Sequence, residues 1–191
     1  MKYLAFLGLF DRDPIVIGGP TGGGAAITTQ DAGPELLDEF YADSTEVAGA
    51  ATETTFDKAL TLPAAKLKVG DIVEATVHIL QTGRNATDTT QIKVHLDNAS
   101  GPILYDSGAL NATANLHLPL ELKFVMTAEG ASGAGRALGY IPFGATGGNG
   151  SFSYDTTAAR KLVVTVTHSS NNAANKTLVK SGYVKLFRKP A

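Results

Sequence analysis

The segment Leu116-His-Leu-Pro-Leu-Glu-Leu-Lys-Phe-Val-Met126 alternates apolar and polar residues from one position to the next. Its leucines, Phe124 and Met126 fall on one side of an extended chain, whereas His117, Glu121 and Lys123 fall on the other. Successive side chains of a β-strand point to opposite faces, so this alternation requires a strand with one buried and one solvated face. The segment therefore predicts a long strand in a sheet that has one face in the core and the other in solvent.

The same pattern recurs along the chain from about residue 45. We expect strands at 54–62, 71–80, 89–96, 103–105, 115–128, 136–143, 151–154, 161–167 and 178–187. Clusters of Gly, Asn, Asp and Ser that are typical of turns separate many of these segments, and no helical period intervenes. Eight or nine short strands without helices predict a sandwich, jelly roll or barrel. We interpret residues 45–191 as a jelly-roll-like antiparallel β-sandwich.

Residues 1–44 differ in composition from the rest of the chain. Glycine and proline are too frequent between residues 13 and 34 for a continuous packed element. A short amphipathic piece follows at 34–41. We predict an extended, Gly-rich N-terminal arm that becomes ordered by docking on another subunit or protein, with 15–17 added as a strand to a partner's sheet edge. The expected anchoring residues are Tyr3, Leu4, Phe6, Leu7, Leu9, Phe10, Ile15, Val16 and Ile17.

Composition excludes several classes of protein. A hydrophobic fraction of 43% and a charged fraction of 18% indicate a folded chain. The net charge of -2 predicts no attraction to nucleic acid or to an anionic membrane. The absence of cysteine excludes disulfides and thiolate chemistry. The apolar run at residues 3–10 is too short to span a bilayer, and no small-residue cleavage site follows it, so we do not expect a signal peptide.

Four connections between the expected strands carry a resemblance to a known group of proteins. The stretch Thr61-Leu-Pro-Ala-Ala-Lys-Leu-Lys-Val-Gly-Asp71 resembles the I-P-A-N-T-L-K-V-G-D connection of jelly-roll virion proteins of tailed bacteriophages. Asn85–Thr90 is similar to the N-x-T-D-T turn of that group, and Tyr105–Ala109 and Asp155–Ala159 extend the likeness. The resemblance covers residues 50–188, and the arm lies outside it.

The resemblance implies a structural component of a phage particle, such as a capsid decoration (cement) protein or a head fibre. Members of the group are commonly trimeric. It therefore implies a homo-oligomer, expected to be a trimer, on the outer surface of the capsid with the major capsid protein as its partner. The arm would then dock across neighbouring capsid proteins while the sandwiches pack around a symmetry axis. This interpretation involves no enzyme activity and no cofactor.

The residues give no competing signature of catalysis or of metal binding. Gly18–Gly24 is the nearest approach to a phosphate-binding loop, but it lacks the closing Gly-Lys-Ser/Thr and is better interpreted as a linker. No Gly-x-Ser-x-Gly elbow is present. The aspartates beside turns are expected to cap local backbone N–H groups: Asp88, Asp97, Asp106 and Asp155. The histidines lack ligand spacing and are expected to be solvated: His78, His95, His117 and His168.

Two other functions stay open at this point. One is a receptor- or glycan-binding module of a tail or head fibre, in which the loops Gly144–Gly150 and Ser169–Asn172 would form the tip. The other is a glycan-active enzyme of jelly-roll fold, which would require two carboxylates facing each other across a compact acidic cleft.

Overall fold

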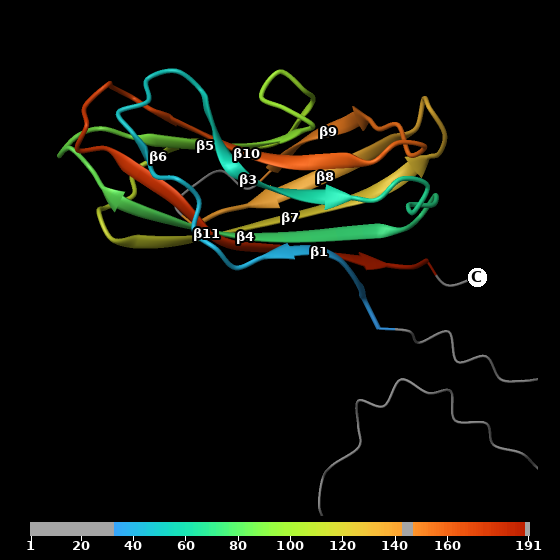
Figure 1. The fold of residues 1–191 in the computed structure, drawn as a ribbon. Coiled ribbons are helices and arrows are strands. Elements are labelled where there is room, and N and C mark those ends of the chain that lie inside the picture. The colour runs from blue at the N-terminus through green and yellow to red at the C-terminus, as the bar shows by residue number, and fades with distance from the viewer. Residues whose placement is uncertain (1–32, 143–146, 190–191) are drawn as a thin grey trace, which may run out of the picture. The chain divides into compact units, whose positions relative to one another are not determined.

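The computed structural model describes residues 33–142 and 147–189. These residues form eleven strands and no helix (Figure 1). The strands are β1 (Glu35–Phe40), β2 (Val47–Ala48), β3 (Thr54–Leu62), β4 (Ile72–Gly83), β5 (Thr90–Leu96), β6 (Ile103–Leu110), β7 (Leu116–Ala128), β8 (Ala134–Tyr140), β9 (Gly147–Ser153), β10 (Arg160–His168) and β11 (Lys176–Phe187). Within this part of the chain there is accordingly no helix that could cross a membrane.

Two antiparallel sheets stack to form the sandwich. The large sheet has the order β1-β11-β4-β7-β8-β9, with the short β2 also paired to β11. The small sheet has the order β3-β10-β5-β6 and lies over the large sheet in Figure 1. The chain crosses between the layers from β2 to β3, from β3 to β4, from β4 to β5, from β6 to β7, from β9 to β10 and from β10 to β11. The expected all-β, jelly-roll-like sandwich is confirmed.

The core lies between the two sheets and consists of the inward residues of each strand. On β7 every second residue from Leu118 to Met126 is buried, as the alternation of the sequence predicts. On β10, Leu162, Val164 and Val166 face the same core from the small sheet. The burial of these apolar side chains is the main favourable contribution to the stability of the sandwich.

Strand β1 is an edge strand within the segment that the sequence interpretation assigns to the arm. It pairs with β11, and a register shift lies between Leu36 and Asp38. The carboxylate of Asp38 accepts a hydrogen bond from the backbone N–H of Thr61 on β3 at 2.6 Å. Leu37 and Phe40 pack against the core. Residues 35–40 therefore belong to the sandwich and close one of its sides, where an amphipathic piece of the arm was expected.

The connection from β3 to β4 is held by a buried carboxylate. Gly70 has a φ of +89°, which glycine adopts without the steric cost of a Cβ, and the expected turn at Gly70–Asp71 is present. The carboxylate of Asp71 accepts hydrogen bonds from the backbone N–H of Lys68 at 2.9 Å, from that of Lys189 at 3.2 Å and from the Arg188 guanidinium at 2.6 Å. This single side chain fixes both the connection and the segment that follows β11.

Among the expected strands, those at 103–105 and 151–154 differ most in extent from the structure. Strand β6 continues to Leu110 rather than ending at residue 105, because it pairs with β5 along that length. Strand β9 begins at Gly147, inside the stretch interpreted as the wide loop Gly144–Gly150. Its glycines carry no side chain, so alternation gives no signal there. The proposed anchoring residues of the arm, Tyr3 to Ile17, lie outside the described residues.

One buried hydroxyl yields a prediction about stability. Tyr154 packs against Phe124 and Phe152, with ring centroids 6.3 Å apart in both pairs, and its hydroxyl has no hydrogen-bond partner. An unsatisfied buried hydroxyl is costly, so Tyr154→Phe should raise the free energy of unfolding by about 1 kcal/mol in urea titrations. The control is Tyr105→Phe, because Tyr105 has a hydrogen bond with the Ile141 backbone and its loss should destabilise. A comparable loss of stability in Tyr154→Phe would contradict this account.

Candidate interaction surface

The solvent-facing side of the large sheet is the candidate functional surface, and we call it the outer face. It consists of the side chains of β1, β4, β7, β8 and β11 that point away from the core. Strand register defines its members. They include Leu36, Glu39, Ile72, Glu74, Thr76, His78, Glu121, Lys123, Val125, Arg136, Leu138, Tyr140, Tyr183, Lys185 and Phe187.

Register places these side chains in three rows across the strands. The first row runs through Phe187, Ile72, Val125 and Arg136. The second runs through Leu36, Lys185, Glu74, Lys123 and Leu138. The third runs through Glu39, Tyr183, Thr76, Glu121 and Tyr140. Directly opposed side chains on paired strands lie about 5 Å apart at Cβ, so each row is a continuous line of contacts.

Large apolar side chains are concentrated on this face. Leu36 is 47% exposed, Ile72 43%, Leu138 57% and Tyr140 46%. Tyr41 follows β1, and its hydroxyl donates to the Glu39 carboxylate at 2.6 Å, so it belongs to the same surface. Val69 is the one other exposed large apolar residue within the described ranges. Leu138 and Tyr140 are neighbours on this face of β8, and Ile72 lies beside Val125, whereas charged side chains separate Leu36 from Leu138. Large apolar residues that stay exposed among charged ones on one sheet face indicate a candidate binding surface.

The charges of the outer face are balanced in sign. Its three rows contain the acidic residues Glu39, Glu74 and Glu121 and the basic residues Lys123, Lys185 and Arg136. Lys123 Nζ lies 2.6 Å from Glu74 Oε1, and Lys185 Nζ lies 4.7 Å from the centroid of the Tyr183 ring. The face is thus close to neutral while presenting both signs among its apolar residues.

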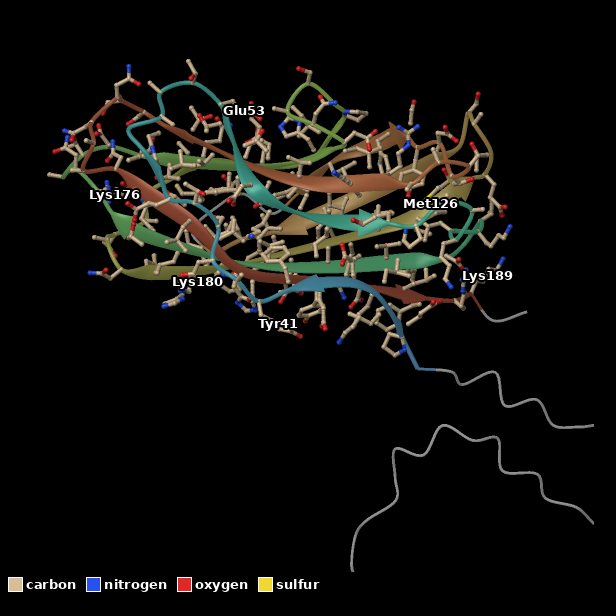
Figure 2. The ribbon with its side chains drawn as sticks, in the orientation of Figure 1. Tyr41, Glu53, Met126, Lys176, Lys180 and Lys189 are labelled. Atoms are coloured by element: carbon tan, nitrogen blue, oxygen red, sulfur yellow. The ribbon has the colours of Figure 1, made fainter. Side chains whose placement is uncertain are left out.

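The small sheet is different, because the chain covers part of its solvent side with a polar cluster. The carboxylate of Glu53 lies 2.5 Å from His95 Nε2 and 2.9 Å from Lys93 Nζ, and it accepts a hydrogen bond from the Thr165 hydroxyl at 2.7 Å. Figure 2 shows Glu53 on the side of the sandwich opposite Tyr41. Burial favours a raised pKa for Glu53, but the hydrogen bonds from Thr165 and Lys93 outweigh it and lower the pKa.

His95 is 2% exposed, so the expectation of a solvated side chain is wrong for this residue. It points outward from β5 as predicted, yet Glu53, which precedes β3, covers it. Its Nδ1 faces the carbonyl of Gly101 at 3.1 Å, and Nε2 faces Glu53. Both ring nitrogens therefore have partners within the fold, and neither is available to a substrate. The cluster fixes the chain over the small sheet.

His168 is also buried, at 1% exposure, and again the expectation is wrong. Its Nδ1 accepts the backbone N–H of Ala50 at 3.1 Å, so the ring proton is on Nε2, which lies 3.0 Å from the Thr177 hydroxyl. The side chain joins β10 of the small sheet to β11 of the large sheet. Burial lowers its pKa, against a smaller opposite effect of Asp88. His78 and His117 are exposed, as expected.

The turn aspartates bind groups of their own loops or, as Asp88 and Asp97 do, groups of distant segments. Asp106 and Asp155 accept N–H groups of residues two positions ahead, as expected. Asp97 accepts the Lys161 N–H and contacts the Arg160 guanidinium. Asp88 instead binds loop side chains, accepting hydrogen bonds from Ser170, Asn175 and Asn85 that lower its pKa to about 2. These carboxylates are committed to contacts within the fold.

The remaining candidate features are small. A hollow of about 200 Å³ is lined by Thr89, Gln91, Ala109, Thr167, His168 and Ser169. Among the described residues no group of three or more acidic or histidine side chains is arranged to hold a metal ion. The outer face is therefore the feature that a functional argument must explain. Sequence reasoning identified several of its outward positions but not their concentration of exposed apolar residues, which depends on the order of strands in the sheet.

Comparison with known proteins gives likeness of fold only. No protein-family model and no curated protein matches the chain. The sugar-binding C-terminal domain of EclA is 16% identical, with a TM-score of 0.32, and the match covers 88% of this chain and 87% of that one. A structure of infectious bursal disease virus, Gt strain, is 13% identical over 92% of this chain and 38% of that one, with a TM-score of 0.36. This chain thus spans less than half of that viral protein.

A third solved structure is the CBM22-1 xylan-binding domain of Xyn10C from Paenibacillus barcinonensis. It is 12% identical, with a TM-score of 0.34, and the match covers 82% of this chain and 97% of that one. Viral and sugar-binding β-sandwich proteins thus both occur among the similar structures. The chain is an antiparallel β-sandwich of jelly-roll type.

The buried state of His168 predicts how stability depends on pH. Its pKa in the folded protein lies below the value of 6.5 for the free side chain, so the unfolded chain binds the proton more readily. The contribution of His168 is complete above pH 6.5 and is lost as the pH falls below that value, at up to about 1.4 kcal/mol per pH unit. The free energy of unfolding, measured by urea titration, should fall more between pH 7.5 and pH 5.5 in the wild type than in His168→Gln. His78→Gln is the exposed control, and equal losses in wild type and His168→Gln would refute the assignment.

Proposed function

We propose that this protein is a non-enzymatic virion structural protein, a capsid decoration (cement) protein that binds the outer surface of a phage head as a homo-oligomer. The observation that carries the proposal is the outer face, where a rigid sheet presents Leu36, Ile72, Leu138 and Tyr140 to solvent. Such a face suits contact with a broad protein surface, which in this proposal is a second copy in the homo-oligomer, while the arm contacts the capsid. Its tyrosines and arginine belong to the residue types that are enriched in protein–protein interfaces.

The resemblance of the strand connections to virion proteins supports the same proposal. In the structure the Gly70–Asp71 turn holds the β3–β4 connection and the end of β11 together. Residues of this kind define a scaffold, so their likeness supports a shared scaffold more directly than a shared role. Placement on the outer capsid surface and contact with the major capsid protein are the parts of the proposal that rest on the resemblance.

The arm is the proposed attachment to the capsid. Its anchoring residues, Tyr3 to Ile17, are apolar enough to dock on a capsid protein, and the described chain begins at Gly33, just before edge strand β1. Several arms on one oligomer would bind several capsid subunits. Once the first arm is bound, the next one binds at a high effective concentration, so modest contacts add to a strong attachment.

A glycan- or receptor-binding module of a fibre is the second candidate, and the exposed rings of Tyr41 and Tyr140 are the observation that favours it. The expected tip loop gives less support. Ser170 is bonded to Asp88, and Asn171 accepts the backbone N–H of Ala51, so polar groups of that loop are already engaged within the fold.

The proposal is tested by adding purified protein to expanded capsids that lack it and imaging them by cryo-electron microscopy. The comparison is a chain lacking residues 2–32, a deletion that leaves β1 and the Asp38–Thr61 contact intact. Its fold is verified by circular dichroism. We expect regular density from the full-length protein and none from the shortened chain.

The other results of this experiment each reject part of the proposal. Density from both chains would keep the decoration role and reject anchoring by the arm. Density from neither would reject decoration and favour the fibre module, for which binding to a glycan array is the next measurement.

A further inference from the structure

We infer that the outer face of the large sheet packs against the same face of a second copy of this chain. The inference rests on the homo-oligomer of the proposed function and assigns its contact surface. The small sheet offers a poorer surface, because the Glu53 cluster already covers part of its solvent side. Exposed large apolar residues of the described strands all belong to the outer face.

Charge favours a second copy over an unrelated partner. The three rows of the outer face carry equal numbers of acidic and basic side chains, interspersed with apolar ones. A partner whose surface has one sign would leave half of these charges opposed by like charge or unpaired. A second copy carries both signs in the same arrangement, so it can match them, as a two-fold interface requires of any self-complementary patch.

The strand order permits a two-fold pairing in which Glu74 and Lys123 of the two copies face each other. A two-fold axis parallel to the strands and midway between β4 and β7 puts β4 over the partner's β7, and β11 over the partner's β8. Because this axis preserves position along the strands, each row faces itself in reverse. Glu74 then faces the partner subunit's Lys123. In the same row Lys185 faces the partner subunit's Leu138.

The other two rows also match under this axis. Ile72 faces the partner subunit's Val125. Phe187 faces the partner subunit's Arg136, which permits a cation–π contact. Tyr183 faces the partner subunit's Tyr140. The pairs on β4, β7, β8 and β11 thus place no like charges together. Glu74 and Lys123 meet an opposite charge, whereas Lys185 faces an apolar side chain and Glu121 faces the hydroxyl of the partner subunit's Thr76.

The size of the face fits a reversible dimer. The face is five strands wide, with about 4.8 Å between strands, and about eight residues long, with a rise of about 3.3 Å per residue. Its flat area is therefore about 600 Å² per copy. Standard interfaces bury about 800 Å² per partner, so the expected contact is near the lower end of specific association. Face-to-face pairing yields two copies, whereas the resemblance implies three, and the measured mass distinguishes them.

The first test is sedimentation equilibrium of the full-length protein from about 1 to 100 µM, a range that spans the micromolar Kd expected for a small interface. We expect a monomer–dimer equilibrium. Leu138→Lys puts a lysine opposite the partner subunit's Lys185 and should raise the dimer Kd at least tenfold. Thr55→Lys, on the exposed side of β3 in the small sheet, is the matched control and should leave the Kd unchanged.

Exchanging the charges of Glu74 and Lys123 separates an effect on dimerisation from an effect on folding. Glu74→Lys should weaken the dimer, because it faces the partner subunit's Lys123, and adding Lys123→Glu should restore it. Thermal melts of all variants control for stability. A protein that stays monomeric, or a dimer that Leu138→Lys leaves unchanged, would overturn the inference. A trimer that Leu138→Lys dissociates would keep the face as the contact and overturn the two-fold pairing.

Cross-linking locates the axis directly, because the chain has no cysteine. Thr76→Cys lies on β4 beside the proposed axis and should yield a covalent dimer with a short bismaleimide, whereas Thr55→Cys should not. No cross-link from Thr76→Cys in a dimeric protein would overturn the pairing. These experiments need no capsid, so their failure is distinguishable from failure of the proposed decoration role: a monomer that decorates capsids rejects the pairing and the homo-oligomer and keeps the decoration role.

Discussion

Burial of alternate residues between two sheets is the constraint on which the rest of this structure depends. Leu118, Leu120 and Leu122 of β7 enter the core, and their neighbours in sequence must therefore point to solvent. A shift of register by one residue would exchange the two sets. The core therefore determines the outer face. The observed pairing of β4, β7 and β11 places Glu74, Lys123 and Lys185 in one row.

Polar contacts between the two sheets add to the stability that apolar burial provides. A sandwich has open sides, where backbone N–H groups of edge strands lack partners and where other chains can add. Asp38 bonds the Thr61 N–H on one such side, and His168 joins β10 to Thr177 of β11. Both contacts use side chains that a composition-based view would assign to solvent. Asp38 is half-buried and His168 is buried, and the polar atoms of both have partners, as buried polar groups require.

Strands with one apolar and one polar face could be predicted from the sequence. Strands without that alternation could not. Strand β7 and the inward residues of β10 followed from alternation, because most residues between the inward leucines and valines are polar; Val163 of β10 is an exception. Strand β1 was missed, since its partner β11 lies at the other end of the chain. His95 was placed on the correct face of β5, but covering by Glu53 is a tertiary contact that local pattern cannot encode. The same limit applies to the outer face.

The two solvent-facing sides of the sandwich differ in how much of each is covered by the chain itself, and this difference is relevant to function. On the small sheet, Glu53 is held against His95 and Lys93, so part of this chain shields the surface. On the large sheet, Leu138 and Tyr140 stay exposed although polar residues would serve the fold of β8 equally well, since neither contributes to the core. Exposed apolar groups add nothing to folding when they are solvated in both states, and they raise the risk of aggregation. A surface with this cost and a balanced set of charges supports the proposed contact with a second copy of the chain, and the strand register that builds the surface would also give that contact a defined geometry.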